Sequence, residues 1–141
     1  MMASEENAAT VAVTLDFAGR TEEALAFYAS AANADVRYLL RFKDGPAGYD
    51  PRLSEKVLHS TFRIGATDLF AKDAGFAAGT QSDFAGFTLT VRTSCVTETQ
   101  VIFSGLAKGG NVVMALTETD FAEQYGVVID RFGITWNVMK H

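Results

Sequence analysis

The sequence contains little cysteine, histidine, proline or tryptophan: among 141 residues there are one cysteine, two histidines, two prolines and one tryptophan. A single cysteine, Cys95, excludes an intrachain disulfide and a cysteine-rich zinc site. As a nucleophile Cys95 would need a nearby base, and neither His59 nor His141 is close to it in sequence. We therefore expect a structural or surface thiol in a reduced, cytoplasmic protein.

Clustered positive charge and long apolar runs are also missing. Twelve Lys and Arg face 17 Asp and Glu, which gives a net charge of −5. Nucleic-acid binding depends on clustered bases, so this balance argues against that class of partner. No apolar stretch reaches the length of a membrane span, and the polar, acidic start does not resemble a signal peptide. We predict a flexible tail at 1–10 and a single domain at 11–141.

Strand and helix periods alternate along this domain. Apolar residues at 11, 13, 15 and 17 predict a half-buried strand. Thr21, followed by two acids, predicts a helix start. Strands are then expected at 36–42, 56–64 and 67–72. This first module covers about residues 11–72, and a linker rich in glycine and small residues follows at 73–85.

The same order of elements returns after the linker. Residues 87–91 alternate as a strand, 95–106 carry a helical stripe capped by Ser94, and strands are expected at 111–116, 125–129 and 134–139. The second module thus covers about 86–139. The repeat predicts an α+β fold of two βαβββ modules with curved mixed sheets, and a ferredoxin-like fold with extra strands is the alternative.

Local motifs agree with this plan. They occur in order from about residue 11 to 139 and are Leu15-Asp-Phe-Ala-Gly19, Glu22-Glu-Ala-Leu-Ala-Phe-Tyr28, Tyr38-Leu-Leu-Arg-Phe42, Lys56-Val-Leu-His-Ser60, Ile102-Phe-Ser-Gly-Leu106 and the segment from Tyr125 to Trp136. Together they resemble the PhnB-like branch of the vicinal oxygen chelate (glyoxalase/bleomycin-resistance/dioxygenase) superfamily. The resemblance implies a cup-shaped sheet and a homodimer.

The metal ligands of that superfamily are not found at the positions that the resemblance implies. These positions fall near Val13, Phe70, Thr88 and Asn137, and none is a histidine or a carboxylate. A catalytic divalent ion usually needs three protein ligands, so we predict no metal and no other cofactor. The branch has also been labelled a ubiquinone methyltransferase, but the turn from Phe17 to Thr21 holds a single glycine, too few for a nucleotide-binding turn.

The resemblance and strand alternation indicate which residues line a cup. The candidates for binding a ligand are Arg41, His59, Phe70, Thr88, Thr90, Phe121 and Asn137, and no residue is predicted to be catalytic. Arg41 could hold an anion, but it could also pair with an acid such as Asp44 or Glu55. His59 could equally be structural. Alternation places Trp136 on the helix side, in the core.

Three functions remain open. The leading hypothesis is a protein that binds a small, partly apolar or anionic molecule in a metal-free cup. The second is a glyoxalase, lyase or dioxygenase with a displaced metal site built from His59 and acids such as Asp16 or Asp73. The third is a structural dimer module whose cup is filled by its own aromatics, for which Phe42, Phe70, Phe84 and Phe121 are candidates.

Overall fold

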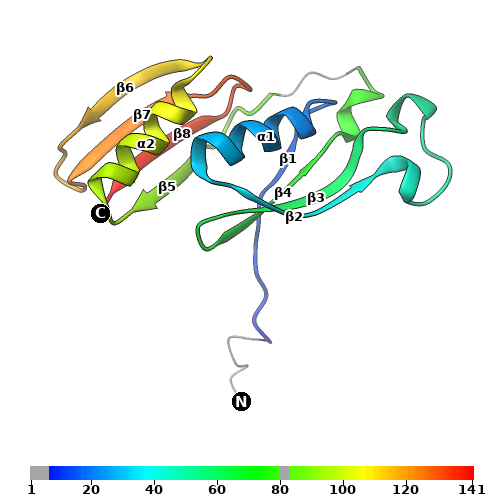
Figure 1. Ribbon diagram of the computed structural model, residues 1–141, viewed down its shortest axis with the longest axis horizontal. Coiled ribbons are helices and arrows are strands. Elements are labelled where there is room, and N and C mark those ends of the chain that lie inside the picture. Colours follow the sequence, from blue (N-terminus) through cyan, green and yellow to red (C-terminus); the bar gives the residue numbers. More distant parts are fainter. Residues whose placement is uncertain (1–6, 80–82) are drawn as a thin grey trace.

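The two predicted modules are present as two four-stranded sheets, each accompanied by one helix (Figure 1). The computed structural model describes residues 7–79 and 83–141, so the predicted linker is only partly described and residues 80–82 lie outside it. The first module comprises β1 (Thr14–Asp16), α1 (Thr21–Ala32), β2 (Asp35–Arg41), β3 (Val57–Ile64) and β4 (Thr67–Lys72); the second comprises β5 (Leu89–Thr93), α2 (Val96–Ala107), β6 (Asn111–Thr117), β7 (Gln124–Ile129) and β8 (Thr135–Lys140). The α+β fold class is confirmed.

Both sheets have the same topology, which follows from the repeated order of elements. The strand orders are β1-β4-β3-β2 and β5-β8-β7-β6. In each sheet the first strand runs parallel to the last one, and the other pairs are antiparallel. A parallel pair requires a crossover, and in each module the helix and the next two strands provide it.

Two details at the start of the chain differ from the sequence prediction. The strand predicted at 11–17 is paired with β4 only over Thr14–Asp16, and the chain before Val13 diverges from the sheet. Thr21 does not cap α1, because it is already the first helical residue and Arg20 occupies the cap position. A carboxylate from a distant part of the chain takes over the capping role.

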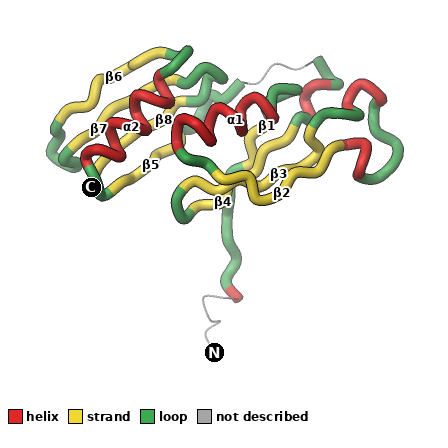
Figure 2. Tube along the Cα trace, viewed as in Figure 1, coloured by secondary structure: helices red, strands yellow, loops and turns green. Residues whose placement is uncertain are grey.

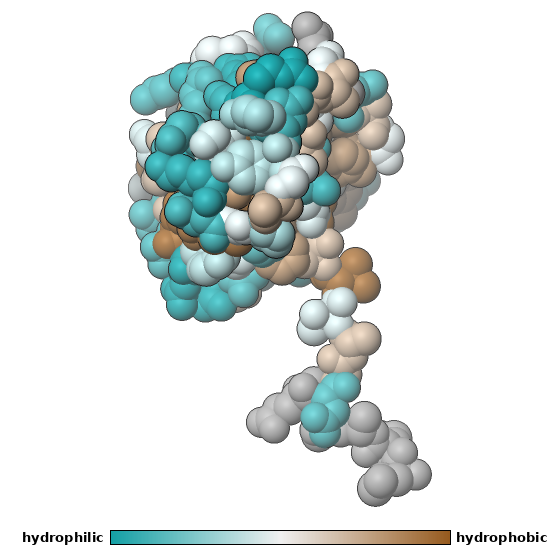
Figure 3. Space-filling view, turned by 90° about the vertical axis from the view of Figure 1, so that its right-hand side faces the viewer, coloured by the Kyte–Doolittle hydropathy of each residue, from teal (hydrophilic) through white to brown (hydrophobic). Residues whose placement is uncertain are grey.

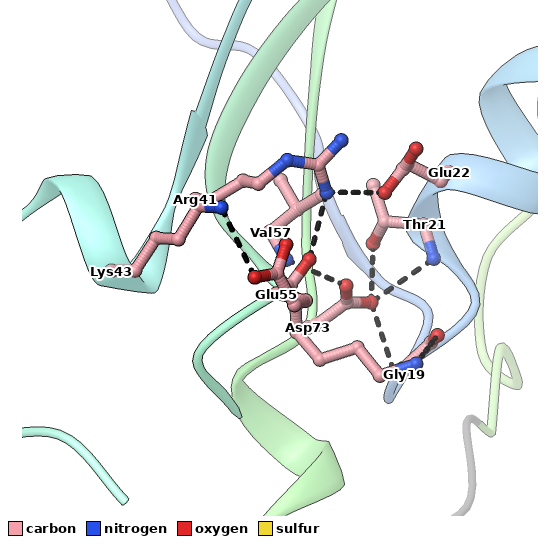
Figure 4. A network of polar contacts seen from close by, with 9 residues as sticks. Gly19, Thr21, Glu22, Arg41, Lys43, Glu55, Val57 and Asp73 are labelled. Carbon is pink, nitrogen blue, oxygen red and sulfur yellow. Dashed lines mark hydrogen bonds and ion pairs between the residues drawn. The ribbon is translucent and has the colours of Figure 1, made fainter. Parts of the chain in front are cut away.

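That carboxylate is Asp73, which is 1% exposed and directly follows β4. Its Oδ1 accepts hydrogen bonds from the backbone N–H groups of Gly19 at 2.9 Å and Thr21 at 3.0 Å, and from the Thr21 hydroxyl at 2.6 Å. Its Oδ2 accepts from the N–H of Val57 at 2.9 Å (Figure 4). Backbone N–H groups at a helix start lack partners within the helix. Asp73 therefore joins the end of β4 to the starts of α1 and β3.

The helices of the two modules pack against each other and over their sheets (Figure 2). Contact is close at Gly105, where a Cβ atom would lie 2.8 Å from the Cα and the carbonyl oxygen of Ala31. One hydrophobic core spans both modules and includes Trp136, as predicted. Neither α1 nor α2 is long and apolar enough to cross a membrane.

A second buried carboxylate joins the modules. Asp130, 3% exposed, lies between β7 and β8, and its Oδ2 accepts hydrogen bonds from the Tyr28 hydroxyl at 2.5 Å and from Trp136 Nε1 at 2.8 Å. Its Oδ1 accepts from the N–H groups of Phe132 and Ile134 at 2.8 and 3.1 Å. Tyr28 belongs to α1, so this bond crosses from the first module to the second.

Replacing Asp73 with alanine should destabilise the fold without touching the open sheet faces. The change leaves the N–H groups of Gly19, Thr21 and Val57 without their shared acceptor, and we expect a loss of roughly 3 kcal/mol in the free energy of unfolding. Urea denaturation measures it. The control is Asp68→Ala, which removes an exposed ion pair with Arg63 and should change the midpoint little. Equal effects of the two substitutions would contradict the role assigned to Asp73.

Tyr28 should make stability depend on alkaline pH. Burial, and then the neighbouring Asp130 carboxylate, raise the pKa of Tyr28 far above its ordinary value of 10.0. The unfolded chain therefore releases this proton near pH 10 while the folded chain keeps it. Stability is then lost as pH rises above the unfolded value, by roughly 1.4 kcal/mol per pH unit. In Tyr28→Phe, the free energy of unfolding, measured by urea titration at pH values from neutral to strongly alkaline, should fall less steeply with pH than in the wild type. An equally steep fall in both proteins would contradict the assignment.

Candidate ligand-binding surface

The face of the first sheet opposite α1 carries a row of three rings. On the helix side, Phe62 and Leu69 are 0% and 6% exposed, so their neighbours in β3 and β4 point to the other face. There the ring centroids of His59 and Phe70 lie 5.2 Å apart, and those of His59 and Tyr38 lie 6.2 Å apart. The row crosses three adjacent strands, β2, β3 and β4, and forms a partly apolar surface with one imidazole at its centre.

The second sheet presents a polar cluster on the corresponding face. Trp136 and Val138 are buried on the helix side, so Asn137 between them points away from α2. Its Nδ2 donates hydrogen bonds to the hydroxyl oxygens of Thr88 at 2.9 Å and Thr90 at 3.2 Å. Both hydroxyl hydrogens, and the amide oxygen of Asn137, therefore remain available to a ligand.

Phe121 lies in the loop between β6 and β7 and is 64% exposed. Its ring meets that of Tyr125 edge-on, with centroids 4.9 Å apart. Tyr125 pairs with Met139 across the sheet, and Met139 shares the open face with Asn137, two residues away in β8. Two aromatic rings thus lie on the same face as the Asn137 amide.

Arg41 does not join either surface. A register shift between Leu40 and Arg41 turns the guanidinium toward α1, where it pairs with Glu22 and donates to the carbonyl oxygen of Glu55 at 2.7 Å (Figure 4). The hydrogen bond from Arg41 lowers the pKa of Glu22. Arg41 is thus bound at the rim of the first sheet by the Glu22 carboxylate and the Glu55 backbone. Pairing with an acid such as Asp44 or Glu55 was the alternative that the sequence left open.

The sequence did not identify Tyr38 and Tyr125 as parts of these surfaces. Counting alternate residues from Val36 would put Tyr38 on the helix side, but a bulge between the two residues turns Tyr38 to the open face, opposite Thr61. Tyr125 lies two residues before Val127 on the same strand, so alternation puts both side chains on one face, and Val127 pairs with Asn137. Alternation could therefore have identified Tyr125. A bulge leaves no comparable signal.

The four aromatic residues considered as internal filling of a cup are spread over the molecule. Phe42 is buried beside Tyr49, at a centroid distance of 6.1 Å. Phe84 packs on Phe17 in the core at 5.4 Å. Of these four, only Phe70 and Phe121 lie on the open faces: Phe70 is in β4 of the first sheet, and Phe121 is in the loop between β6 and β7 of the second module.

The donors on the open faces do not fit a metal ion. Within the described ranges, no three His, Cys, Asp or Glu side chains form a group that could hold one. Asp73 accepts four hydrogen bonds near α1, and Asp16 accepts from the N–H groups of Ala18 and Gly75, both at 2.9 Å. Neither carboxylate combines with His59 as the displaced site would require.

Added metal should therefore not bind this surface tightly. Chelator-treated protein, dialysed against a slight excess of Zn²⁺ or Mn²⁺, should retain no stoichiometric ion by elemental analysis, and its thermal midpoint should not rise. His59→Ala should behave in the same way. A stoichiometric ion that is lost in His59→Ala would contradict this assignment and favour an enzyme.

The amino-acid sequence of this chain is similar to those of known proteins. The family model described as 3-demethylubiquinone-9 3-methyltransferase matches residues 9–139. The protein YjdN of Escherichia coli is 30% identical over 138 residues, which cover 89% of this chain and 92% of YjdN. These matches span both modules, so the likeness concerns the whole domain.

Solved structures of similar proteins share the fold. PA1353 from Pseudomonas aeruginosa superposes with a TM-score of 0.83 at 28% identity, covering 95% of this chain and 98% of PA1353. The PhnB protein of Bacillus cereus, also described as a 3-demethylubiquinone-9 3-methyltransferase, gives a TM-score of 0.75 at 23% identity, covering 94% of this chain and all of its own. A glyoxalase-related enzyme from Fulvimarina pelagi gives 0.59 at 17% identity, with 94% and 88% covered.

Proposed function

Because this chain belongs to the PhnB-like family of the glyoxalase/bleomycin-resistance/dioxygenase superfamily, we propose that it binds a small, partly apolar or anionic molecule without a metal ion. The observation that carries this proposal is the pair of uncovered sheet faces, one with the ring row of Tyr38, His59 and Phe70 and the other with the Asn137 cluster. Apolar surface with a few hydrogen-bonding groups is typical of small-molecule sites.

Each surface suits a different part of such a ligand. The row of rings offers stacking and apolar contact to a flat group. The hydroxyls of Thr88 and Thr90 can donate to a carboxylate, sulfonate or carbonyl oxygen, and the amide oxygen of Asn137 can accept from a donor. We propose a ligand that contains both kinds of group, an aromatic or otherwise flat apolar part and one polar or anionic end. We propose a homodimer as the functional form.

The methyl transfer named in the family description is not part of this proposal. A nucleotide-type methyl donor would need an open turn between β1 and α1, but a Cβ atom on Gly19 would already lie 2.6 Å from the ring of Phe76. The N–H groups of Gly19 and Thr21 are given to Asp73. The sheets are also mixed, whereas a Rossmann-type donor site lies on a parallel sheet. The residues present therefore do not fit such a cofactor.

Binding can be tested with 8-anilinonaphthalene-1-sulfonate, a fluorescent probe that is aromatic, apolar and anionic. We expect saturable binding by titration calorimetry and fluorescence, weakened about tenfold in Tyr38→Ala, because one ring of the row is lost. Asn137→Ala should weaken binding to a similar degree by removing the amide beside the hydroxyls.

The matched control is Val36→Ala. Val36 lies on the same strand as Tyr38 and is 42% exposed, but it pairs with the buried Phe62 and so belongs to the opposite face. Probe binding should be unchanged in this variant. If the wild-type protein bound neither the probe nor any member of a metabolite set, the structural-module hypothesis would replace the proposal; equal losses in Tyr38→Ala and Val36→Ala would place binding elsewhere.

A further inference from the structure

The last residue of β4, Lys72, lies beside the row of rings on the first sheet. It follows Phe70 by two positions, so strand alternation puts both side chains on the open face, while Ala71 between them is buried on the helix side. Ser60 of β3 pairs with Ala71 in antiparallel register. The residues one step further, His59 and Lys72, therefore lie opposite each other on the open face.

Lys72 is partly buried, yet in the part of the chain that the structure describes no ion pair or hydrogen bond engages its ammonium group. The acid that faces it on the neighbouring strand β1 is Asp16. Both carboxylate oxygens of Asp16 accept from backbone N–H groups, those of Ala18 and Gly75. The ammonium group therefore keeps its three hydrogen-bond donors for another partner.

The arginines of the first sheet are already engaged. Arg63 donates to both carboxylate oxygens of Asp68, at 2.7 and 3.3 Å. Arg37 pairs with Asp35 at 3.1 Å. The third arginine of this sheet is the one that turns toward α1 and pairs with an acid there. Among the described residues of this sheet, Lys72 is therefore the cation without a carboxylate partner.

The chain before β1 does not fold back over this face. Residues 8–12 are all exposed and extend away from the body of the molecule (Figure 3). Thr14, which neighbours Phe70 on β1, is also exposed. The helix α1 covers the opposite face of the sheet (Figure 2). Lys72 and the row of rings are thus accessible to a small molecule in one copy of the chain.

A flat group stacked on the rings would place its substituent within reach of Lys72. Neighbouring strands lie about 4.8 Å apart, and alternate residues of one strand are roughly 6.6 Å apart. Lys72 is the cross-strand neighbour of His59 and the alternate neighbour of Phe70, whose ring centroids lie 5.2 Å apart. The four-carbon stem of Lys72 therefore starts beside both rings and can carry the ammonium group to their edge.

We propose that Lys72 recognises the negative charge of the bound molecule while the row of rings holds its apolar part. This inference rests on the proposed function and narrows its ligand to an aromatic or other flat acid, with a carboxylate, sulfonate or phosphate group beside the ring system. An ammonium group forms charge-assisted hydrogen bonds with such an anion, which are roughly twice as strong as bonds between neutral groups. The hydroxyls joined to Asn137 are neutral donors, so they favour an acid over its uncharged analogue less than Lys72 does.

Two fluorescent probes that differ only in the charged group test this role. They are 8-anilinonaphthalene-1-sulfonate and N-phenyl-1-naphthylamine, which has the same rings without the sulfonate. In Lys72→Met the dissociation constant of the sulfonate should rise about tenfold, while that of the uncharged probe should change less than about twofold. Lys72→Arg should keep the wild-type constants within a few-fold, because it restores the charge. Raising the salt concentration should weaken sulfonate binding to the wild type more than to Lys72→Met.

The matched control is Arg92→Met, which removes an equal charge from the second sheet. Arg92 pairs in register with Met139, which lies on the open face of that sheet. This variant should bind both probes as the wild type does. Equal losses for the two probes in Lys72→Met, or a loss of sulfonate binding in Arg92→Met alone, would overturn the role of Lys72 and leave the proposed function in place. A wild type that bound neither probe would overturn both proposals.

Discussion

The hydrogen bond between the Tyr28 hydroxyl and the Asp130 carboxylate is the contact on which the rest of this structure depends. It joins α1 of the first module to the β7–β8 turn of the second. The same carboxylate also holds Trp136 and two backbone N–H groups, so both of its oxygens are saturated in the core. Such a fully bonded carboxylate fixes geometry in a way that apolar packing alone does not.

The two buried carboxylates act entirely on the helix side of the sheets. Asp73 organises the start of α1 and Asp130 organises the contact between modules. Because these bonds and the shared core stabilise the fold, the opposite faces of both sheets contribute less to its stability. This division explains why half-exposed rings and hydroxyls can be displayed there at little cost in stability.

The sequence predicted the fold class well because the repeat of strand, helix and three strands is a global pattern that small errors at element ends do not change. Alternation also placed Trp136 in the core. It did not predict the direction of Tyr38 or Arg41, since each lies next to a register shift in β2 that reverses the count. Nor could it identify Asp73 as the cap of α1, because that contact joins residues 52 positions apart.

The separation of the two sides has a consequence for how this protein can change over time. Substitutions at Tyr38, His59 or Asn137 would alter the proposed ligand surface while leaving the buried carboxylates untouched. If this surface binds a ligand as proposed, single mutations there could change the ligand while the fold tolerates each of them. A shared architecture with this division would then not require relatives to share a ligand.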